Sequence, residues 1–389
     1  PSLRTLLTGL YPLQFDNYLD SMKSKFKNKD TTLNDLEKGL ELVKFEHSII
    51  KNFHTLPKML KQKNYKSFEG GKYWEGTYEM GGFDDGMSNR FGDELFKDYH
   101  LLLAMAGGDG LKFARETQKP LYDFIDSLDN QPFFIWYAPM LPHTPFNPPE
   151  DLLALYKNKD ISESAKVYYA MCTWFDETCG QLIDLLEKRN IRDDTIIVYV
   201  TDNGWIQNPE RNGYAPRSKQ TPYEGGIRTP IMFSWPNGGL KNGKRKDVVS
   251  SIDLFPTVLA ATGARTPKGL PGLNLLENLK TEKPIKRKGI FGESFAHDIA
   301  DIENPEDSLL FRWTIEGKWK LLLTYDGEVN RYKTTHPREE KRPQLFNLLK
   351  DPKEEKNLAE QNPKVVVRLA AKIGKWWPVK ERKVLTKWE

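Results

Sequence analysis

Short apolar runs alternate with longer stretches of helical periodicity along most of the chain. Runs rich in β-branched and aromatic residues predict strands at 133–138, 195–201 and 230–235. Helical periodicity predicts helices over 113–128 and 163–189. Strands that are almost wholly apolar and alternate with helices indicate a mostly parallel central sheet with helices on both faces, an α/β fold. In such a sheet the functional residues gather at the carboxyl ends of the strands.

The first residues predict a short helix, with Leu6 and Leu7 on its apolar face and Gly9 at its end. Pro1 stands in the first turn of that helix, where its missing N–H costs nothing. No initiator Met or apolar leader precedes this helix, so we expect the sequence to be a fragment of a longer chain.

The pattern changes after residue 285, where the strands become closely spaced. "GIFGES", "LLFRWTIEGKWKLLLTY" and "QLFNLLKDP" predict antiparallel strands, with a hairpin turn at Glu316-Gly317, and "KVVVRLAAKIGKWW" predicts an amphipathic helix that caps them. We therefore expect an α/β domain over 1–284, with a surface insertion at 13–50, and a smaller antiparallel subdomain over 285–389.

Composition narrows the classes of partner. The 389 residues include 58 Lys and Arg and 54 Asp and Glu, a net charge of +4. This excess is dispersed, so we expect an anionic substrate and no nucleic acid. No apolar run approaches the roughly 20 residues of a membrane-spanning helix, so no membrane partner is expected. Cys172 and Cys179 are about 10.5 Å apart along the predicted helix, too far for a disulfide.

Two polar stretches follow predicted strands. In "YVTDNGW", Asp202 and Asn203 offer two oxygen ligands for calcium, or alternatively magnesium, although Asp-Asn-Gly is also a common turn. In "APMLPHTPFNPP", prolines stiffen the loop around His143. A histidine held there is suited to protonating a leaving oxygen, and its alternative role is structural.

Two lysines lie in glycine-containing loops. Lys219 precedes "EGG" in "RSKQTPYEGGIRTP", where it could stabilise a developing oxyanion or be a solvated surface lysine. Lys72 lies in "EGGKYWEGTYEMGGFDDG", which suggests an anion site but does not have P-loop spacing. The neighbouring Trp74 suits either the core or a surface on which a sugar stacks.

The order of these motifs resembles that of the sulfatases, members of the alkaline phosphatase superfamily. The resemblance rests on "PSLRTLLTG", "GKYW", "PHTP", "TDNG", "KQTPYEGGIRTP" and the tail "LFNLLKDPKEEKNLA", and it spans nearly the whole chain. It implies an alkaline phosphatase-like fold and a formylglycine two positions before Pro1, made from Cys or Ser, whose hydrated aldehyde attacks sulfur. Because that position precedes the sequence, we expect the 389 residues alone to be inactive.

The resemblance also implies roles for individual residues. Asp202 and Asn203 would complete a calcium site, Lys72 and Lys219 would bind sulfate oxygens, and His143 would contact the sulfate or the leaving oxygen. Arg4 would support the nucleophile, although Leu3 occupies the usual arginine position. Three more residues are expected at the substrate. Trp74 stands where many members have a histidine, Trp205 suits a sugar face, and His297 in "GESFAHD" would serve the pocket or cap a loop.

The implied reaction is release of sulfate from a sulfated carbohydrate or a small sulfated molecule, in the periplasm or outside the cell. One alternative is a phosphomonoesterase or phosphodiesterase of the same superfamily. Another is a non-catalytic relative that binds sulfated glycans, which Trp74 motivates. The sequence carries no indication of an oligomeric state.

Overall fold

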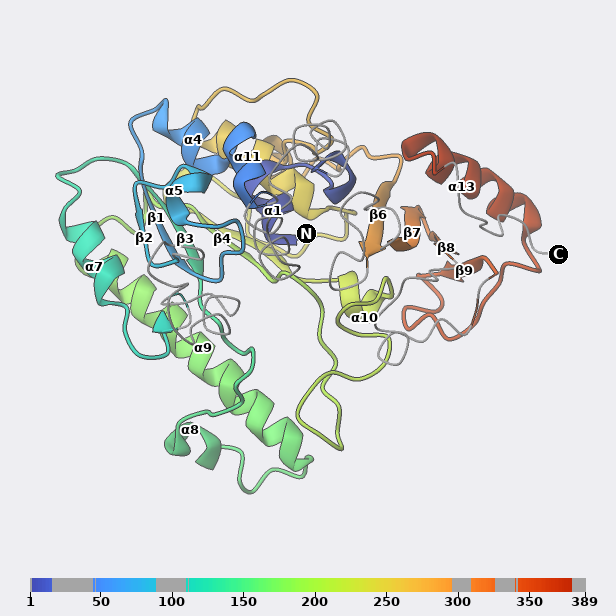
Figure 1. Ribbon diagram of the computed structural model, residues 1–389, viewed down its shortest axis with the longest axis horizontal. Coiled ribbons are helices and arrows are strands. Elements are labelled where there is room, and N and C mark those ends of the chain that lie inside the picture. The colour runs from blue at the N-terminus through green and yellow to red at the C-terminus, as the bar shows by residue number, and fades with distance from the viewer. Residues whose placement is uncertain are drawn as a thin grey trace, which may run out of the picture.

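The structure, a computed structural model, describes residues 2–15, 45, 47–88, 110, 112–295, 309–325, 340 and 342–379 (Figure 1). The elements follow one another as α1 (Ser2–Thr8), η1 (Ile49–Asn52), α4 (Leu56–Lys61), β1 (Lys66–Gly71), α5 (Tyr78–Gly81), β2 (Asp85–Gly86), α7 (Lys119–Asp126), β3 (Phe133–Ala138), α8 (Glu150–Ala154), α9 (Glu163–Lys188), β4 (Ile197–Val200), α10 (Glu224–Ile227), β5 (Ile231–Ser234), η3 (Pro236–Gly238), η4 (Ser251–Asp253), α11 (Leu254–Ala261), α12 (Leu276–Thr281), β6 (Ile290–Phe295), β7 (Leu309–Glu316), β8 (Trp319–Thr324), β9 (Gln344–Asn347) and α13 (Pro363–Trp376).

A parallel sheet with the order β2-β1-β3 confirms the predicted sheet direction. Its strand β3 has the predicted bounds, and its last residue Ala138 pairs with Gly71 at the end of β1. The sequence did not reveal β1, because "KSFEGG" has one strong strand former and a central glutamate, Glu69. That glutamate is fully buried and accepts hydrogen bonds from the backbone and hydroxyl of Ser88.

Helices cover both faces of this sheet, as predicted (Figure 1). On one face, helices α1, α4 and α11 form a core that includes Leu7, Leu60 and Phe255 and packs on β3 and β4. On the other face, α7 and α9 pack on β1 and β3 through side chains such as Phe124 and Leu182. The two apolar layers fix the sheet from both sides, so the polar residues that follow its strands are left at the edge.

Strand β5 differs in direction from the expectation. It pairs antiparallel with β4, with Val200 opposite Ile231. The expected parallel arrangement needs a crossover that is usually helical, whereas the chain between β4 and β5 consists of loops and the four-residue α10. These loops carry Asp202 and Lys219, so the polar connection itself becomes part of the site.

The helix predicted over 163–189 is confirmed as α9, and Ser162 caps it by accepting a hydrogen bond from the amide of Ala165. The helix predicted over 113–128 is wrong in its first half, because only α7 is helical there. Residues 112–117 form a tight turn in which Ala114 has a φ of 61°. Pro120 lies in the first turn of α7, the place where proline is compatible with a helix start.

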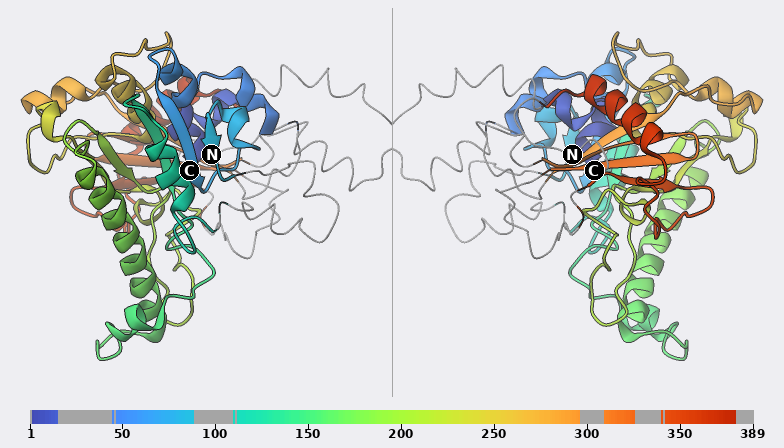
Figure 2. Two further views of the ribbon diagram at one scale, coloured as in Figure 1. Left: turned by 90° about the vertical axis from the view of Figure 1, so that its left-hand side faces the viewer. Right: turned by 90° about the vertical axis from the view of Figure 1, so that its right-hand side faces the viewer.

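The C-terminal part contains the predicted antiparallel sheet, in the order β6-β7-β8-β9. The hairpin between β7 and β8 turns at Gly317, whose φ of 58° favours glycine. Helix α13 packs on this sheet through Val366, Leu369 and Ile373, and the right-hand view of Figure 2 shows it across the strands. Where the two predicted domains divide stays a prediction.

The first helix is also as predicted. Helix α1 ends before Gly9, whose φ is 71° and whose Cα lies so near Phe255 that a Cβ would come within 2.8 Å of that side chain. Both cysteines are free. Pro1, most of the insertion expected at 13–50, and His297 lie outside the described residues. Within the described ranges, no helix is both long and apolar enough to cross a membrane.

Candidate active site

Four polar side chains from four separate stretches of sequence meet beyond the carboxyl ends of β1, β3 and β4. Lys72 follows β1, and its backbone amide donates to the carbonyl of Ala138 at 2.5 Å. His143 lies in the loop after β3, and Asp202 follows β4. Lys219 comes from the long connection between β4 and β5. The structure thus brings together residues that the sequence placed in four different motifs.

Lys72 and Asp202 form the closest contact of this group. The ammonium Nζ of Lys72 lies 2.5 Å from Oδ2 of Asp202, and 17% and 31% of the two side chains are exposed. Burial raises the pKa of Asp202, but the charge and hydrogen bond of Lys72, with a further contribution from Lys219, outweigh it and hold that pKa below its usual value. Trp136 of β3 fixes the backbone by donating from Nε1 to the carbonyl of Lys72 at 3.2 Å.

The positive charges of both lysines act on the imidazole of His143. Burial, followed by the positive charges of Lys219 and Lys72, lowers its pKa to about 4. Its Nδ1 lies 3.2 Å from the carbonyl oxygen of Thr144. A carbonyl only accepts, so the neutral ring carries its proton on Nδ1 and leaves Nε2 as an acceptor. The imidazole is therefore neutral at pH 7 beside these lysines.

Lys219 is supported by aromatic rings. Its Nζ lies 5.7 Å from the ring centroid of Trp205, which stacks on Tyr168 at 5.4 Å with an angle of 12° between the rings. Burial and then the charge of Lys72 lower the pKa of Lys219. Trp205 thus contacts Lys219 in this structure, and its expected contact with a sugar stays a prediction. Trp74 is placed in a similar way, since the Nζ of Lys72 lies 5.9 Å from its ring.

Glycines bring the Asp202 loop against the Lys219 loop. The amide of Gly204 donates to the carbonyl of Gly226 at 2.8 Å. A Cβ on Gly204 would lie 2.3 Å from the carbonyl oxygen of Gly225, closer than any side chain tolerates. The three glycines are therefore needed for the close approach of the two loops.

Arg4 lies in a separate ion pair with Glu75, a residue that the sequence analysis overlooked. Its Nε donates to Oε2 of Glu75 at 2.8 Å, and its guanidinium lies 5.1 Å from the ring of Phe15. Burial raises the pKa of Glu75, but the Arg4 charge and hydrogen bond outweigh this effect and lower it. The pair ties α1 to the loop after β1. Glu75 is one of several acidic residues in this glycine-rich stretch, so nothing in the sequence distinguished it.

A second buried ion cluster joins α10 to the C-terminal sheet. Lys320 of β8 is fully buried, and its Nζ lies 2.8 Å from Glu354 and 3.1 Å from Glu224. Oε2 of Glu354 also accepts the backbone amide of Glu224 at 2.6 Å. Glu224 directly precedes the glycine pair that contacts Gly204, so the cluster anchors one side of the site.

Asp202 and Asn203 have the oxygen donors that a hard cation prefers, and they fit one part of a calcium site. Nδ2 of Asn203 donates to the carbonyl of Gly204 at 2.9 Å, so its side-chain oxygen points the other way from that bond. Calcium takes six to eight oxygen ligands, more than these two residues supply. Among the described residues, no group of three or more His, Cys, Asp or Glu side chains could hold a metal ion.

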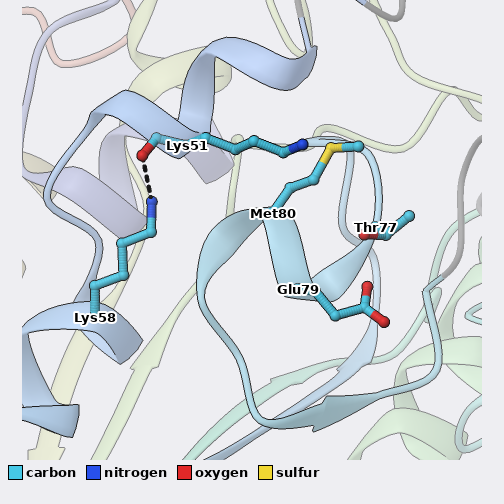
Figure 3. A pocket seen from close by; sticks show the side chains of 5 residues that line it. All are labelled: Lys51, Lys58, Thr77, Glu79 and Met80. Carbon is cyan, nitrogen blue, oxygen red and sulfur yellow. Dashed lines mark hydrogen bonds between the residues drawn. The ribbon is translucent and has the colours of Figure 1, made fainter.

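A separate cavity of about 440 Å³ lies beside α5 (Figure 3). It is lined by Lys51, Lys58, Thr77, Glu79 and Met80, none of which belongs to the predicted site. The ammonium of Lys58 donates to the carbonyls of Ile50, Lys51 and Phe53, so this charge stabilises the end of η1. This cavity and the polar group of the site are therefore different places.

The family profile described as Sulfatase matches residues 1–264, about two thirds of the chain. The chain belongs to the sulfatase family. A second profile, N-sulphoglucosamine sulphohydrolase, C-terminal, matches residues 216–376.

Curated relatives carry names from the same family. The chain is 27% identical over 253 residues to a "Sulfatase" of Formosa agariphila, covering 60% of this chain and 43% of the relative. It is 29% identical over 231 residues to "Arylsulfatase K" of Canis lupus familiaris, covering 56% of this chain and 38% of the relative. The chain thus spans about two fifths of the length of these sulfatases.

Solved structures of low identity confirm the fold. A structure from work on the metabolism of multiple glycosaminoglycans by Bacteroides thetaiotaomicron has a TM-score of 0.67 at 19% identity and covers 97% of this chain and 88% of its own. Ps i-CgsB in complex with k-i-k-neocarrahexaose has a TM-score of 0.62 at 22% identity and covers 86% and 80%. A complex with the substrate D-glucosamine-2-N,6-O-disulfate has a TM-score of 0.63 at 18% identity and covers 84% and 82%. The predicted alkaline phosphatase-like α/β fold is therefore confirmed.

Proposed function

We propose that the protein containing this chain hydrolyses sulfate esters of carbohydrates. The observation that carries the proposal is the meeting of Lys72, Lys219 and His143 around Asp202 beyond the carboxyl ends of the strands. Two cations and an imidazole in a half-buried setting suit a tetrahedral anion and a leaving oxygen. The names of the relatives support this activity, since they include a sulfatase and arylsulfatase K.

In this proposal the lysines bind and orient the sulfate oxygens. Water is partly excluded around both ammonium groups, which strengthens their attraction for the anionic sulfate group of the ester. His143 is neutral in the field of the two lysines, and the negative charge of a bound sulfate ester offsets part of that field. The pKa of His143 then rises, so the ring can hold a proton next to the leaving oxygen and transfer it.

The family resemblance adds two groups to this scheme. A formylglycine two positions before Pro1 would supply the nucleophile, and a calcium ion held by Asp202 and Asn203 would supply a Lewis acid. Helix α1 would follow that nucleophile directly, and the Arg4–Glu75 pair fixes the helix against the loop that carries Lys72.

The proposed substrate class rests on the aromatic surroundings and on the neighbours. Trp74, Trp205 and Tyr168 lie around the two lysines, and aromatic rings suit the apolar faces of sugars. Solved neighbours include proteins in complex with a neocarrahexaose and with a sulfated glucosamine, which supports a sulfated saccharide.

The test uses the chain expressed with the residues that precede Pro1 in its gene. Sulfate release is measured by ion chromatography from sulfated glycosaminoglycan and carrageenan oligosaccharides and from an aryl sulfate, with an aryl phosphate in parallel. Removing one oxyanion-stabilising charge in Lys219→Met should lower kcat/KM about 10²- to 10³-fold. The control is Lys318→Met in the β7–β8 turn, a surface lysine that lies over Trp319.

Three results would contradict the proposal. Phosphate release without sulfate release would favour the phosphatase alternative. Binding of sulfated oligosaccharides without release of sulfate would favour a non-catalytic relative, the reading that Trp74 motivates. Equal activity of the Lys219 and Lys318 variants would remove Lys219 from the site.

A further inference from the structure

The loop that carries His143 has too few N–H donors for its own backbone carbonyls. Residues 139–149 include five prolines, at positions 139, 142, 145, 148 and 149. A proline has a carbonyl acceptor but no N–H donor, so this loop has an excess of acceptors. Because half-buried carbonyls need partners, donors must come from another part of the chain.

One side chain supplies several of these donors. The Nε and Nη2 of Arg115 donate to the carbonyl of Met140 at 3.1 and 2.7 Å. Nη2 also donates to the carbonyl of His143 itself at 2.6 Å. Nη1 donates to the carbonyl of Pro145 at 3.3 Å and to Oδ1 of Asn147 at 2.8 Å. A single guanidinium thus contacts four residues of the loop.

The turn at 112–117 explains how Arg115 reaches the loop. Ala114 adopts a φ of 61°, and its amide donates to the carbonyl of Thr117 at 3.0 Å. Arg115 therefore projects from a tight turn and not from the helix that the sequence pattern predicted. Its guanidinium also lies 5.5 Å from the ring of Trp174 on α9, so it is held from a second side.

We propose that Arg115 is a positioning residue for His143, acting through the backbone of the Pro-rich loop. This inference rests on the proposed function for the assignment of His143, and the hydrogen bonds that carry it are independent of that assignment. The guanidinium fixes the loop on both sides of His143, at Met140 and at Pro145 and Asn147. The imidazole is thereby held beside Lys72, Lys219 and Asp202, the charged groups that act on it.

The five donors of an arginine are essential to this role. The planar fork serves carbonyls that lie in different directions, whereas a lysine offers one point charge on a flexible stem. Arg115→Lys should therefore keep the charge and lose most of the positioning, and Arg115→Met should lose both.

The experiment compares these two variants with Arg192→Met as a matched control. Arg192 is also half-buried and donates to a loop carbonyl, that of Thr195, but it lies before β4, at the opposite end of the strand from Asp202. All measurements use the chain expressed with the residues that precede Pro1. They are the imidazole NMR resonances of His143, assigned with His143→Gln, the Kd for inorganic sulfate, and kcat and KM for the sulfate ester.

In Arg115→Met we expect displaced His143 resonances and a kcat that falls about 10- to 100-fold, since small misplacements of a reacting group have effects of this size. The sulfate Kd and KM should stay within about twofold, because both lysines remain. Methylguanidinium added to Arg115→Met should restore part of kcat. Arg192→Met should change none of these quantities, whatever its effect on thermal stability.

Unchanged His143 resonances in both Arg115 variants would overturn the inference, and so would equal losses of kcat in Arg115→Met and Arg192→Met. If the wild-type chain releases no sulfate, the proposed function fails and the His143 resonances alone decide the inference. If Arg115→Met does not fold, Arg115→Lys provides the same comparison.

Discussion

Replacing Lys219 by Met should make His143 easier to protonate. The pKa of His143 is about 4, against 6.5 for an ordinary histidine, and burial, Lys219 and Lys72 lower it in that order. At 1.36 kcal/mol per pKa unit, the difference corresponds to about 3 kcal/mol in favour of the neutral ring, an upper value because the ring is partly exposed. Removing the Lys219 charge should raise the pKa toward its ordinary value, although burial and Lys72 still lower it.

Sulfate should act in the same direction and more strongly. A dianion bound between Lys72 and Lys219 compensates both charges that act on the imidazole, so the pKa of His143 should approach or exceed 6.5 at saturating sulfate. The measurement is an NMR titration of the imidazole nitrogens between pH 3.5 and 8, with and without sulfate. The chain has 6 histidines, and His143→Gln identifies the relevant resonance.

The same group should affect stability with a defined sign. Since the folded-state pKa of His143 lies below the unfolded value, the unfolded chain binds the extra proton between about pH 6.5 and pH 4. The free energy of unfolding should therefore fall as pH falls through this window, and His143→Gln should flatten the profile there. A His143 pKa that neither Lys219→Met nor sulfate changes would refute this account of the site.

Three further predictions concern the frame around the site. Lys320→Met leaves the buried carboxylate of Glu354 without its cation. It should lower the free energy of unfolding by about 3–5 kcal/mol in urea titrations. An unchanged urea midpoint would contradict a stabilising role of the ion cluster. Gly204→Ala places a methyl group against the carbonyl of Gly225 and should weaken sulfate binding measured by calorimetry at least tenfold, while wild-type affinity would contradict the need for glycine. Burial raises the pKa of Glu69 to about 8, so the folded state loses stability as pH rises from 4.5 to 8. Glu69→Gln should therefore raise Tm at pH 8 more than at pH 5. An equal change of Tm at both pH values would show that Glu69 titrates normally.

The sequence predicted those parts of the site that are local to a strand end. Asp202 and His143 each follow an apolar run whose pattern identifies a strand, so their place at the carboxyl edge could be inferred without the structure. Strand β1 was missed because its centre is Glu69, a buried glutamate to which Ser88, 19 residues further along the chain, donates hydrogen bonds. The hydrophobic pattern of a segment does not show that a buried polar side chain in it is hydrogen-bonded by a residue outside the segment.

Arg115 shows the same limit at a functional residue. It lies in a stretch whose apolar spacing favours a helix, and the positive φ of Ala114, which no pattern signals, turns the chain instead. The sequence did show the loop that Arg115 contacts. That loop has five prolines and therefore too few N–H donors for its own carbonyls. A donor could have been anticipated from that loop, although not which arginine provides it.

The C-terminal sheet is connected to the site by a continuous set of contacts. Lys320 of β8 forms an ion pair with Glu224, which directly precedes the glycines at 225 and 226. The carbonyl of Gly226 accepts a hydrogen bond from the amide of Gly204, two residues beyond Asp202. A shift of the C-terminal sheet would therefore move α10 and, with it, the loops that carry Lys219 and Asp202. Since these contacts are buried ion pairs and close backbone approaches, they tolerate little displacement. The antiparallel subdomain is thus part of the framework of the site, and mutations in it should change sulfate affinity as well as stability.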